Sequence, residues 1–245
     1  MTMRMPRLFI EQALVAGTEI TLHDAPAHYV RNVLRLERGN TLSVFDDSGS
    51  EFTAVLAAIE RRSLRLALGN ALTAATESPL SVHLGIGLAR GERMDWTVQK
   101  STELGVATIT PLLLARCNAK LDAGRGDNRL RHWRQVAIAA CEQSGRRRLP
   151  SIEPPLPLED WLAARADMPG LVLHTTGNGA LVADPPPGAV RVLVGPEGGL
   201  DPTEFTRACT AGFSPWSLGP RVLRTETAPV AALAILQYLW GDLRA

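Results

Sequence analysis

Hydrophobic and polar positions alternate along the first part of the chain with the period of extended strands. Residues 42–45 and 51–59 form two such runs, separated by an Asp-Ser-Gly turn signal, and residues 63–68 alternate strictly. Residues 28–36 instead have the spacing of a short helix that ends before Gly39. Several short strands with tight turns predict a small all-β barrel or sandwich.

The pattern changes after residue 79, where apolar strand-length runs begin to alternate with amphipathic stretches of helical length. This alternation predicts an α/β domain with a mainly parallel sheet. The expected strands are 81–88, 106–114, 171–174 and 190–194, and the expected helices are 92–104 and 128–144.

Residues 71–79 separate the two patterns, because they are small and polar and end in proline. We therefore expect two domains, an all-β domain over residues 1–72 and an α/β domain over residues 73–245.

Composition limits the class of protein. The 245 residues are 45% hydrophobic and 21% charged, which excludes a disordered chain, a collagen-like fibre and a disulfide-stapled miniprotein. The most apolar stretch, 228–240, is too short to cross a membrane and contains Gln237, and the N-terminus lacks the apolar run of a signal peptide. We therefore expect no membrane partner. The three cysteines lie far apart, so we also expect no metal site and a cytoplasmic location.

Charge is segregated within an almost neutral chain. Residues 116–148 carry nine basic and three acidic side chains, whereas residues 151–215 carry eight acidic side chains and three arginines. Of the 26 cations only two are lysines. This arginine usage has two open explanations, the base composition of the genome or a surface that contacts phosphates.

Two glycine-rich segments follow predicted strands. Gly85, Gly87 and Gly91 approximate a dinucleotide-binding fingerprint, but the spacing is one residue too long and the expected acidic partner is missing. We favour a simple strand-end turn there, and a dinucleotide-dependent oxidoreductase is the least favoured function.

The second glycine-rich segment is Gly-Pro-Glu-Gly-Gly at 195–199, between the strand at 190–194 and a helix start. Asp201 is the expected N-cap of that helix, Pro202 suits its first position, and Glu204 completes a capping pattern. Glycines leave the backbone bare, so a ligand can approach its N–H and C=O groups. The segment predicts either a cofactor loop or a plain tight turn.

Two further segments carry polar side chains at strand-to-helix junctions or on a helix face. Residues 218–228 (Leu-Gly-Pro-Arg-Val-Leu-Arg-Thr-Glu-Thr-Ala) cluster two arginines and a glutamate before a helix that begins near Thr225 and is apolar on nearly every side. That helix suits a thick core or a subunit interface. On the helix 92–104, Arg93, Trp96, Lys100 and Glu103 share one face, which is either a solvated face or part of a site.

Together these segments resemble the RsmE family of 16S rRNA uridine-N3 methyltransferases within the SPOUT superfamily. The matching pieces keep the family's order over nearly the whole chain. They are Arg7-x-Phe9, His28 with Val33-Leu34-Arg35 and Gly39, the run from Gln99 to Val106, Glu142-Gln143 with Arg146 and Pro150, residues 195–199 and residues 218–228. Pro229 departs from the run of small residues expected after Ala228.

The resemblance implies a fold and a cofactor. The fold would be an α/β SPOUT domain with a C-terminal deep trefoil knot, preceded by a small all-β PUA-like barrel that binds RNA, and the enzyme would be a homodimer. S-adenosyl-L-methionine would bind at Leu173, His174, Thr175, Val194, Gly195, Pro196, Glu197, Gly198, Gly199, Leu218, Gly219, Arg221, Val222 and Leu223.

The implied reaction is methylation of N3 of a uridine in the decoding region of small-subunit ribosomal RNA, position 1498 in the family's naming. Arg224 suits stabilisation of the uracil anion, because a guanidinium matches charge spread over two oxygens. Its alternative role is an ion pair with Glu226 or Glu197. Glu226, Glu197 or water would accept the N3 proton.

The RNA contacts remain open in part. Arg7, Arg35, Lys100, Arg146, Arg147 and Arg148 are candidate phosphate contacts, and Trp96 or Trp133 either stacks on a base or packs in the core. Two rival functions remain, a SPOUT methyltransferase of another RNA such as tRNA and a non-catalytic RNA-binding module. Saturable cofactor binding would distinguish an enzyme from a binding module.

Overall fold

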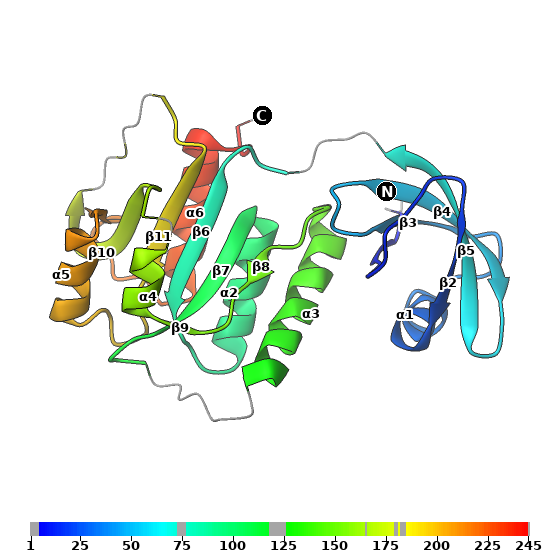
Figure 1. Ribbon diagram of the computed structural model, residues 1–245, viewed down its shortest axis with the longest axis horizontal. Coiled ribbons are helices and arrows are strands. Elements are labelled where there is room, and N and C mark those ends of the chain that lie inside the picture. Colours follow the sequence, from blue (N-terminus) through cyan, green and yellow to red (C-terminus); the bar gives the residue numbers. More distant parts are fainter. Residues whose placement is uncertain are drawn as a thin grey trace. The chain divides into compact units, whose positions relative to one another are not determined.

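The computed structural model describes residues 5–72, 77–117, 126–164, 166–178, 181 and 185–244. The chain forms two compact units (Figure 1). One unit comprises Met1–Thr76 together with Cys141–Arg148, and the other comprises Glu77–Ala140 and Leu149–Ala245. We call them the N-terminal unit and the α/β unit. The middle of the predicted linker, residues 73–76, lies outside the described residues.

A five-stranded sheet forms the N-terminal unit, in the order β1-β3-β4-β5-β2. Its pairings are antiparallel except for β1 with β3, which are parallel. Alternate residues point into one core, as in β4, where Phe52, Ala54 and Leu56 are buried while Val55 and Ile59 are exposed. The strands are β1 (Arg7–Phe9), β2 (Glu19–His23), β3 (Thr41–Phe45), β4 (Glu51–Ile59) and β5 (Ser63–Leu72).

The predicted helix at 28–36 takes a different form. Helix α1 (Asp24–His28) begins earlier and continues into a wider π-helical turn, η1 (Tyr29–Val33), in which Leu34 N–H donates to the Tyr29 carbonyl. Val30 is completely buried, and Arg31 reaches the carbonyls of Glu60, Arg61 and Ser63 at the β4–β5 turn. These tertiary contacts favour the wider turn over a regular helix.

The α/β unit is built on a seven-stranded sheet in the order β12-β10-β11-β6-β7-β8, with β9 also paired to β7. Every one of these pairings is parallel, which confirms the predicted α/β class. The strands are β6 (Ser81–Gly87), β7 (Val106–Leu113), β8 (Ser151–Ile152), β9 (Leu156–Pro157), β10 (Gly170–Asn178), β11 (Ala189–Val194) and β12 (Phe213–Trp216).

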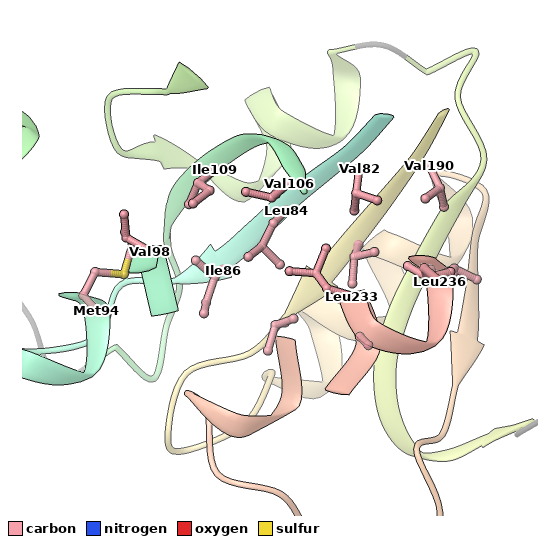
Figure 2. Packing of buried hydrophobic residues seen from close by; sticks show 14 of the residues in the cluster. Val82, Leu84, Ile86, Met94, Val98, Val106, Ile109, Val190, Leu233 and Leu236 are labelled. Atoms are coloured by element: carbon pink, nitrogen blue, oxygen red, sulfur yellow. The ribbon is translucent and has the colours of Figure 1, made fainter. Parts of the chain in front are cut away.

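Helices cover both faces of this sheet. On one face α2 (Glu92–Glu103) and α6 (Thr227–Trp240) pack on alternate residues of β6 and β11 and on Val106 and Ile109 of β7 (Figure 2). Helix α3 (Gly126–Ser144) contributes Trp133 and Ala137 to the same cluster. On the other face α4 (Leu158–Ala163) and α5 (Pro202–Thr210) cover the intervening residues. The sheet is therefore buried on both sides, which explains why its strands read as continuous apolar runs.

Several short elements escaped the sequence patterns, namely β1, β2, β8, β9, α4 and β12. Strand β12 is the most important of them, because it places Trp216 beside the end of β10. It contains Pro215, which an edge strand tolerates because it need not donate on its outer side.

Gln237, the polar residue in the most apolar stretch, is completely buried in α6. Its amide nitrogen donates to the Gly105 carbonyl at 3.4 Å, and its amide oxygen accepts from Ser78 Oγ at 2.6 Å. The side chain thus ties α6 to the turn after α2. Across the described part of the chain, no helix combines the length and the apolar character that crossing a membrane requires.

Candidate functional site

A pocket of about 310 Å³ opens at the carboxyl ends of β10 and β11, where parallel α/β sheets bind their ligands. Three segments form most of its wall: residues 173–175 of β10, just past the part of that strand that pairs with β11; residues 194–200, from the end of β11 toward α5; and residues 216–228, from the end of β12 into α6. Arg116, which follows β7, adds to the wall. Its lining consists of Arg116, Leu173, His174, Thr175, Val194, Gly195, Pro196, Gly199, Leu200, Trp216, Ser217, Leu218, Gly219, Arg221, Val222, Leu223, Thr225 and Ala228.

Close backbone contacts bring these segments together. A Cβ atom on Gly87, at the end of β6, would lie 2.6 Å from the Pro196 nitrogen, so only glycine lets the loop after β11 rest there. Likewise, a Cβ on Gly177 would lie 2.6 Å from the carbonyl carbon of Pro215. The bare strand ends therefore allow the loops to meet over the sheet.

The loop after β11 leads directly into α5, whose start is capped as expected. The Asp201 side chain accepts from the Thr203 N–H at 3.0 Å, and Glu204 Oε2 accepts from the Asp201 N–H at 2.9 Å. Hydrogen bonds from Thr203 lower the pKa of Asp201, and Arg116 adds to this effect. The two hydrogen bonds between Asp201 and residues 203 and 204 confirm the predicted capping box and fix one end of the loop.

The stretch from β12 to α6 forms the third wall. Gly219 has a φ of +105°, a conformation that suits glycine, and the Arg224 carbonyl accepts the N–H groups of Thr227 and Ala228 at the start of α6. Leu223 and Thr225 line the pocket, and Thr225 is buried. Arg224, between them, lies outside the lining, with 82% of its side chain exposed and Nη1 4.0 Å from Glu226 Oε1.

Twelve of the fourteen residues predicted to bind the cofactor lie in this lining. The two others, Glu197 and Gly198, do not line the pocket but are bonded to arginines from other elements. Arg93 Nη1 donates to Glu197 Oε1 at 2.8 Å, and Arg116 Nη1 donates to the Gly198 carbonyl at 3.1 Å. The partner of Glu197 is thus Arg93.

Six lining residues were not among the predicted cofactor ligands: Arg116, Leu200, Trp216, Ser217, Thr225 and Ala228. Arg116 follows a predicted strand, so the rule that ligands bind at the carboxyl ends of strands could have indicated it. Trp216 gave no signal, because it ends a four-residue strand without a clear alternation.

Three of the predicted phosphate contacts lie in the interior of the N-terminal unit. Arg7 Nε donates to Glu51 Oε1 at 2.8 Å, Arg147 Nε donates to Glu51 Oε2 at 3.0 Å, and the Arg146 carbonyl accepts from Arg7 at 2.9 Å. Arg7, Arg146, Arg147 and Glu51 are all largely buried. Here the arginines attach residues 141–148 to the sheet.

The other predicted phosphate contacts are more accessible. Arg35 and Arg148 are exposed; Arg35 has a φ of +52°, and Arg148 Nη2 donates to the Ser48 carbonyl at 2.9 Å. Lys100, in α2, pairs with Glu103 at 2.8 Å. Trp133 packs in the core of the α/β unit, whereas 39% of Trp96 is exposed.

Comparison with known proteins identifies the family. The sequence profile of the RNA methyltransferase domain matches residues 76–237, and that of the RNA methyltransferase PUA domain matches residues 24–68. The ribosomal RNA small subunit methyltransferase E of Buchnera aphidicola from Schizaphis graminum is 33% identical over 99% of this chain and 100% of its own length. The chain belongs to the ribosomal RNA small subunit methyltransferase E family. The member from Bacillus subtilis is 29% identical over 98% of this chain and 99% of its own.

Solved structures similar to this family member include two with a bound ligand. The ribosomal RNA small subunit methyltransferase E of Neisseria gonorrhoeae, bound to S-adenosyl methionine, has a TM-score of 0.92 at 36% identity and covers 98% of this chain and 100% of its own. A methyltransferase of Legionella pneumophila with the same cofactor has a TM-score of 0.92 at 37% identity over the same shares.

The pocket of this family member fits a cofactor of that type. The volume lies at the lower end of the usual range for small-molecule sites. Leu173, Val194 and Leu218 offer apolar surface for a flat base, while Gly195, Gly199 and Gly219 leave backbone groups accessible. Apolar walls with bare backbone around them suit an adenosyl group, which needs both apolar contact and hydrogen bonds.

Proposed function

We propose that the protein transfers a methyl group from S-adenosylmethionine to N3 of a uridine in small-subunit ribosomal RNA, at position 1498 of the decoding region in the family's naming. The observation that carries this proposal is the pocket, where segments 173–175, 194–200 and 216–225 meet over the carboxyl ends of the sheet. Family membership supports the same activity.

The cofactor would be held by the pocket's bare backbone and apolar walls, with residues 195–199 and 218–223 in the main roles. When bound, S-adenosylmethionine supplies a methyl group on a positively charged sulfur, and a nucleophile that attacks this methyl carbon in line displaces the sulfur as a neutral thioether. Such a reaction gains most from positioning and electrostatics, both of which the chain's own residues provide.

Uracil N3 becomes a good nucleophile once its proton has left, and the resulting negative charge spreads over O2 and O4. Arg224 would stabilise this anion, because its guanidinium is exposed next to two pocket residues, Leu223 and Thr225. Glu226, with Oε1 4.0 Å from Arg224 Nη1, would orient the arginine or accept the proton. Glu197 suits this acid–base role less well, because it is paired with Arg93 outside the lining.

The remaining features of the proposal concern the whole molecule. Exposed Arg35 and Arg148, together with half-buried Lys100, would contact RNA phosphates. The segment 217–226 joins edge strand β12 to α6, which packs in the same cluster as β6 and β11, and a C-terminal trefoil knot formed by this part of the chain is included in the proposal. Exposed Ile235 and Tyr238 on α6 support a homodimer, and rRNA as the substrate supports a cytoplasmic location.

Nucleoside mass spectrometry tests the activity directly. The purified protein and S-adenosylmethionine are incubated with small ribosomal subunits that lack the modification, with naked rRNA and with tRNA, and each RNA is then digested to nucleosides. We expect 3-methyluridine from ribosomal substrates. A peak from subunits alone would also show that the assembled subunit is the substrate.

Two results would contradict the proposal. A methylated nucleoside from tRNA alone would indicate a methyltransferase of another RNA. The absence of cofactor binding, measured by calorimetry, would indicate a non-catalytic RNA-binding module.

A further inference from the structure

The loop between β11 and α5 is attached to two arginines that come from other parts of the α/β unit. Arg93, in the first turn of α2, donates to Glu197 Oε1 at 2.8 Å. Arg116, which follows β7, donates to the Gly198 carbonyl at 3.1 Å, and its Nη2 lies 3.6 Å from Asp201 Oδ2. Consecutive loop residues are thus fixed from two separate elements.

A second set of contacts makes the joint at Arg116 tight. The N–H of the preceding residue, Ala115, donates to Glu204 Oε1 at 2.7 Å, at the start of α5. A Cβ atom on Gly198 would lie 3.1 Å from Arg116 Cβ, closer than most side chains tolerate. The turn after β7 and the loop after β11 therefore lie in direct contact on both sides of the hydrogen bond from Arg116 to the Gly198 carbonyl.

The fastened residues differ from those that face the pocket. Gly195, Pro196, Gly199 and Leu200 line it, whereas Glu197 and Gly198 do not. Three glycines give this loop wide conformational freedom, and a backbone-lined site binds its ligand only if the N–H and C=O groups are held in place. The two arginines supply that restraint from outside the pocket.

We propose that Arg93 and Arg116 are positioning residues, which hold residues 195–199 in the shape that binds the adenosyl part of the cofactor. This inference rests on the proposed function and assigns a task to the polar face of α2. Arg116 also lines the pocket, so the competing role for it is direct binding of the cofactor's amino-acid carboxylate. The two roles differ in which ligands they affect.

Calorimetry on the full-length chain with two ligands distinguishes the roles. S-adenosylhomocysteine carries the amino-acid end, and 5′-methylthioadenosine lacks it. We expect Arg116→Gln to raise the dissociation constants of both ligands by the same factor, about tenfold, as for the loss of a charge-assisted hydrogen bond. Arg93→Gln should raise both about threefold, because its ion pair is more exposed.

Three further variants separate positioning from charge and from general damage. Gly198→Ala keeps both arginines but pushes the loop away from Arg116, so it should also weaken both ligands equally. Arg93→Glu combined with Glu197→Arg should restore most of the affinity that either single change removes. Arg90→Gln, an equal change of charge at an exposed residue just before α2, should leave both dissociation constants unchanged.

The proposal is overturned for Arg116 if Arg116→Gln weakens S-adenosylhomocysteine alone, and for either arginine if its variant binds both ligands normally. In both arginine variants the Michaelis constant for RNA and the midpoint of thermal unfolding should change little. A large drop in the midpoint that the charge swap does not rescue would also contradict the proposal. If the unaltered chain binds neither ligand, the proposed function itself fails, and this inference fails with it.

Discussion

Arg224 separates two tasks between its backbone and its side chain. Its carbonyl accepts two N–H groups at the start of α6, whereas its guanidinium is mostly exposed. Replacing the side chain therefore leaves the helix start and the buried Thr225 unchanged. This makes Arg224 a suitable position to test chemistry apart from folding.

We expect Arg224→Ala to lower the turnover rate about 100-fold, in line with the loss of one group that stabilises a developing negative charge. The dissociation constant for S-adenosylmethionine should stay within about twofold, because the side chain lies outside the pocket lining. Single-turnover formation of 3-methyluridine and calorimetry measure the two quantities. Arg224→Lys serves as the control that retains the charge but loses the fork, and its rate should be intermediate. Equal losses of turnover and cofactor affinity would contradict the catalytic assignment.

At the scale of elements, two carboxylates join the end of α3 and the residues after it to the sheet of the N-terminal unit: Glu51 in β4 and Glu142 in the last turn of α3. Their pKa values shift in opposite directions. Burial alone would raise the pKa of Glu51, but hydrogen bonds from Arg7, Ser43 and Arg147 lower it overall. Burial raises the pKa of Glu142, although it accepts the Phe9 N–H at 3.0 Å and lies near Arg7. Folding therefore favours the ionised form of Glu51 and the protonated form of Glu142.

The two carboxylates predict opposite effects of pH on stability. The lowered pKa of Glu51 stabilises the fold above about pH 4, and this contribution is lost as the pH falls through its folded value. The raised pKa of Glu142 has the reverse sign, because stability falls as the pH rises from about 4 through its folded value.

Two isosteric variants test this pair. At pH 7 Glu51→Gln should lower the free energy of unfolding by about 3–5 kcal/mol, because it leaves buried arginines without their charge partner. Glu142→Gln should raise the free energy of unfolding at pH 7, since its amide oxygen can still accept the Phe9 N–H, and this gain should disappear near pH 4. Urea unfolding followed across that pH range gives both values. A loss of stability at pH 7 for Glu142→Gln would contradict the assignment.

At the scale of the whole molecule, α6 has two apolar sides. Ala232, Leu233 and Leu236 are buried in the core, while Ile235 and Tyr238 are exposed, as is Leu243 just beyond the helix (Figure 2 shows the buried side). Exposed apolar side chains grouped on one helix are typical of an interface. They are the basis of the proposed homodimer.

We expect the double substitution Ile235→Glu and Tyr238→Glu to convert a dimer into a monomer, because it places charges within the interface. Light scattering after size-exclusion chromatography measures the mass. Val33→Glu, at an exposed apolar residue of the N-terminal unit, is the matched control and should leave the dimer intact. A dimer that withstands the double substitution would show that another surface forms the interface.

RNA binding also belongs to this scale, because it depends on summed charge. Removing Arg35 and Arg148 should make the dependence of RNA affinity on salt shallower, by about 0.7 in log–log slope for each phosphate that the protein no longer neutralises. Filter binding at several salt concentrations measures the slope, with Arg90→Gln as a control for charge alone. An unchanged slope would exclude both arginines as phosphate-binding residues.

The sequence by itself determined most of the elements and the glycine-rich turn that enters the pocket wall. The pattern of hydrophobic residues predicted strands such as β4 and β11. A strand buried on one face alternates apolar and polar residues, and a strand buried on both faces is a continuous apolar run. The cap at Asp201 and the glycines at 195–199 were equally readable, since both act over a few neighbouring residues. Interactions between neighbouring residues therefore leave a pattern that the sequence shows directly.

Only the tertiary structure decided which partners the charged residues find. Arg7 and Arg147 share Glu51, which is 44 and 96 residues away, and Arg191, in a strand that reads as apolar, donates to the carbonyls of Trp161, Leu162 and Ala164. The pairing of Glu197 with Arg93 was equally hidden. A long cation looks the same in the sequence whether it lies in solvent or in an internal network, because the carboxylate or carbonyl that decides between them arrives only when distant strands pack together.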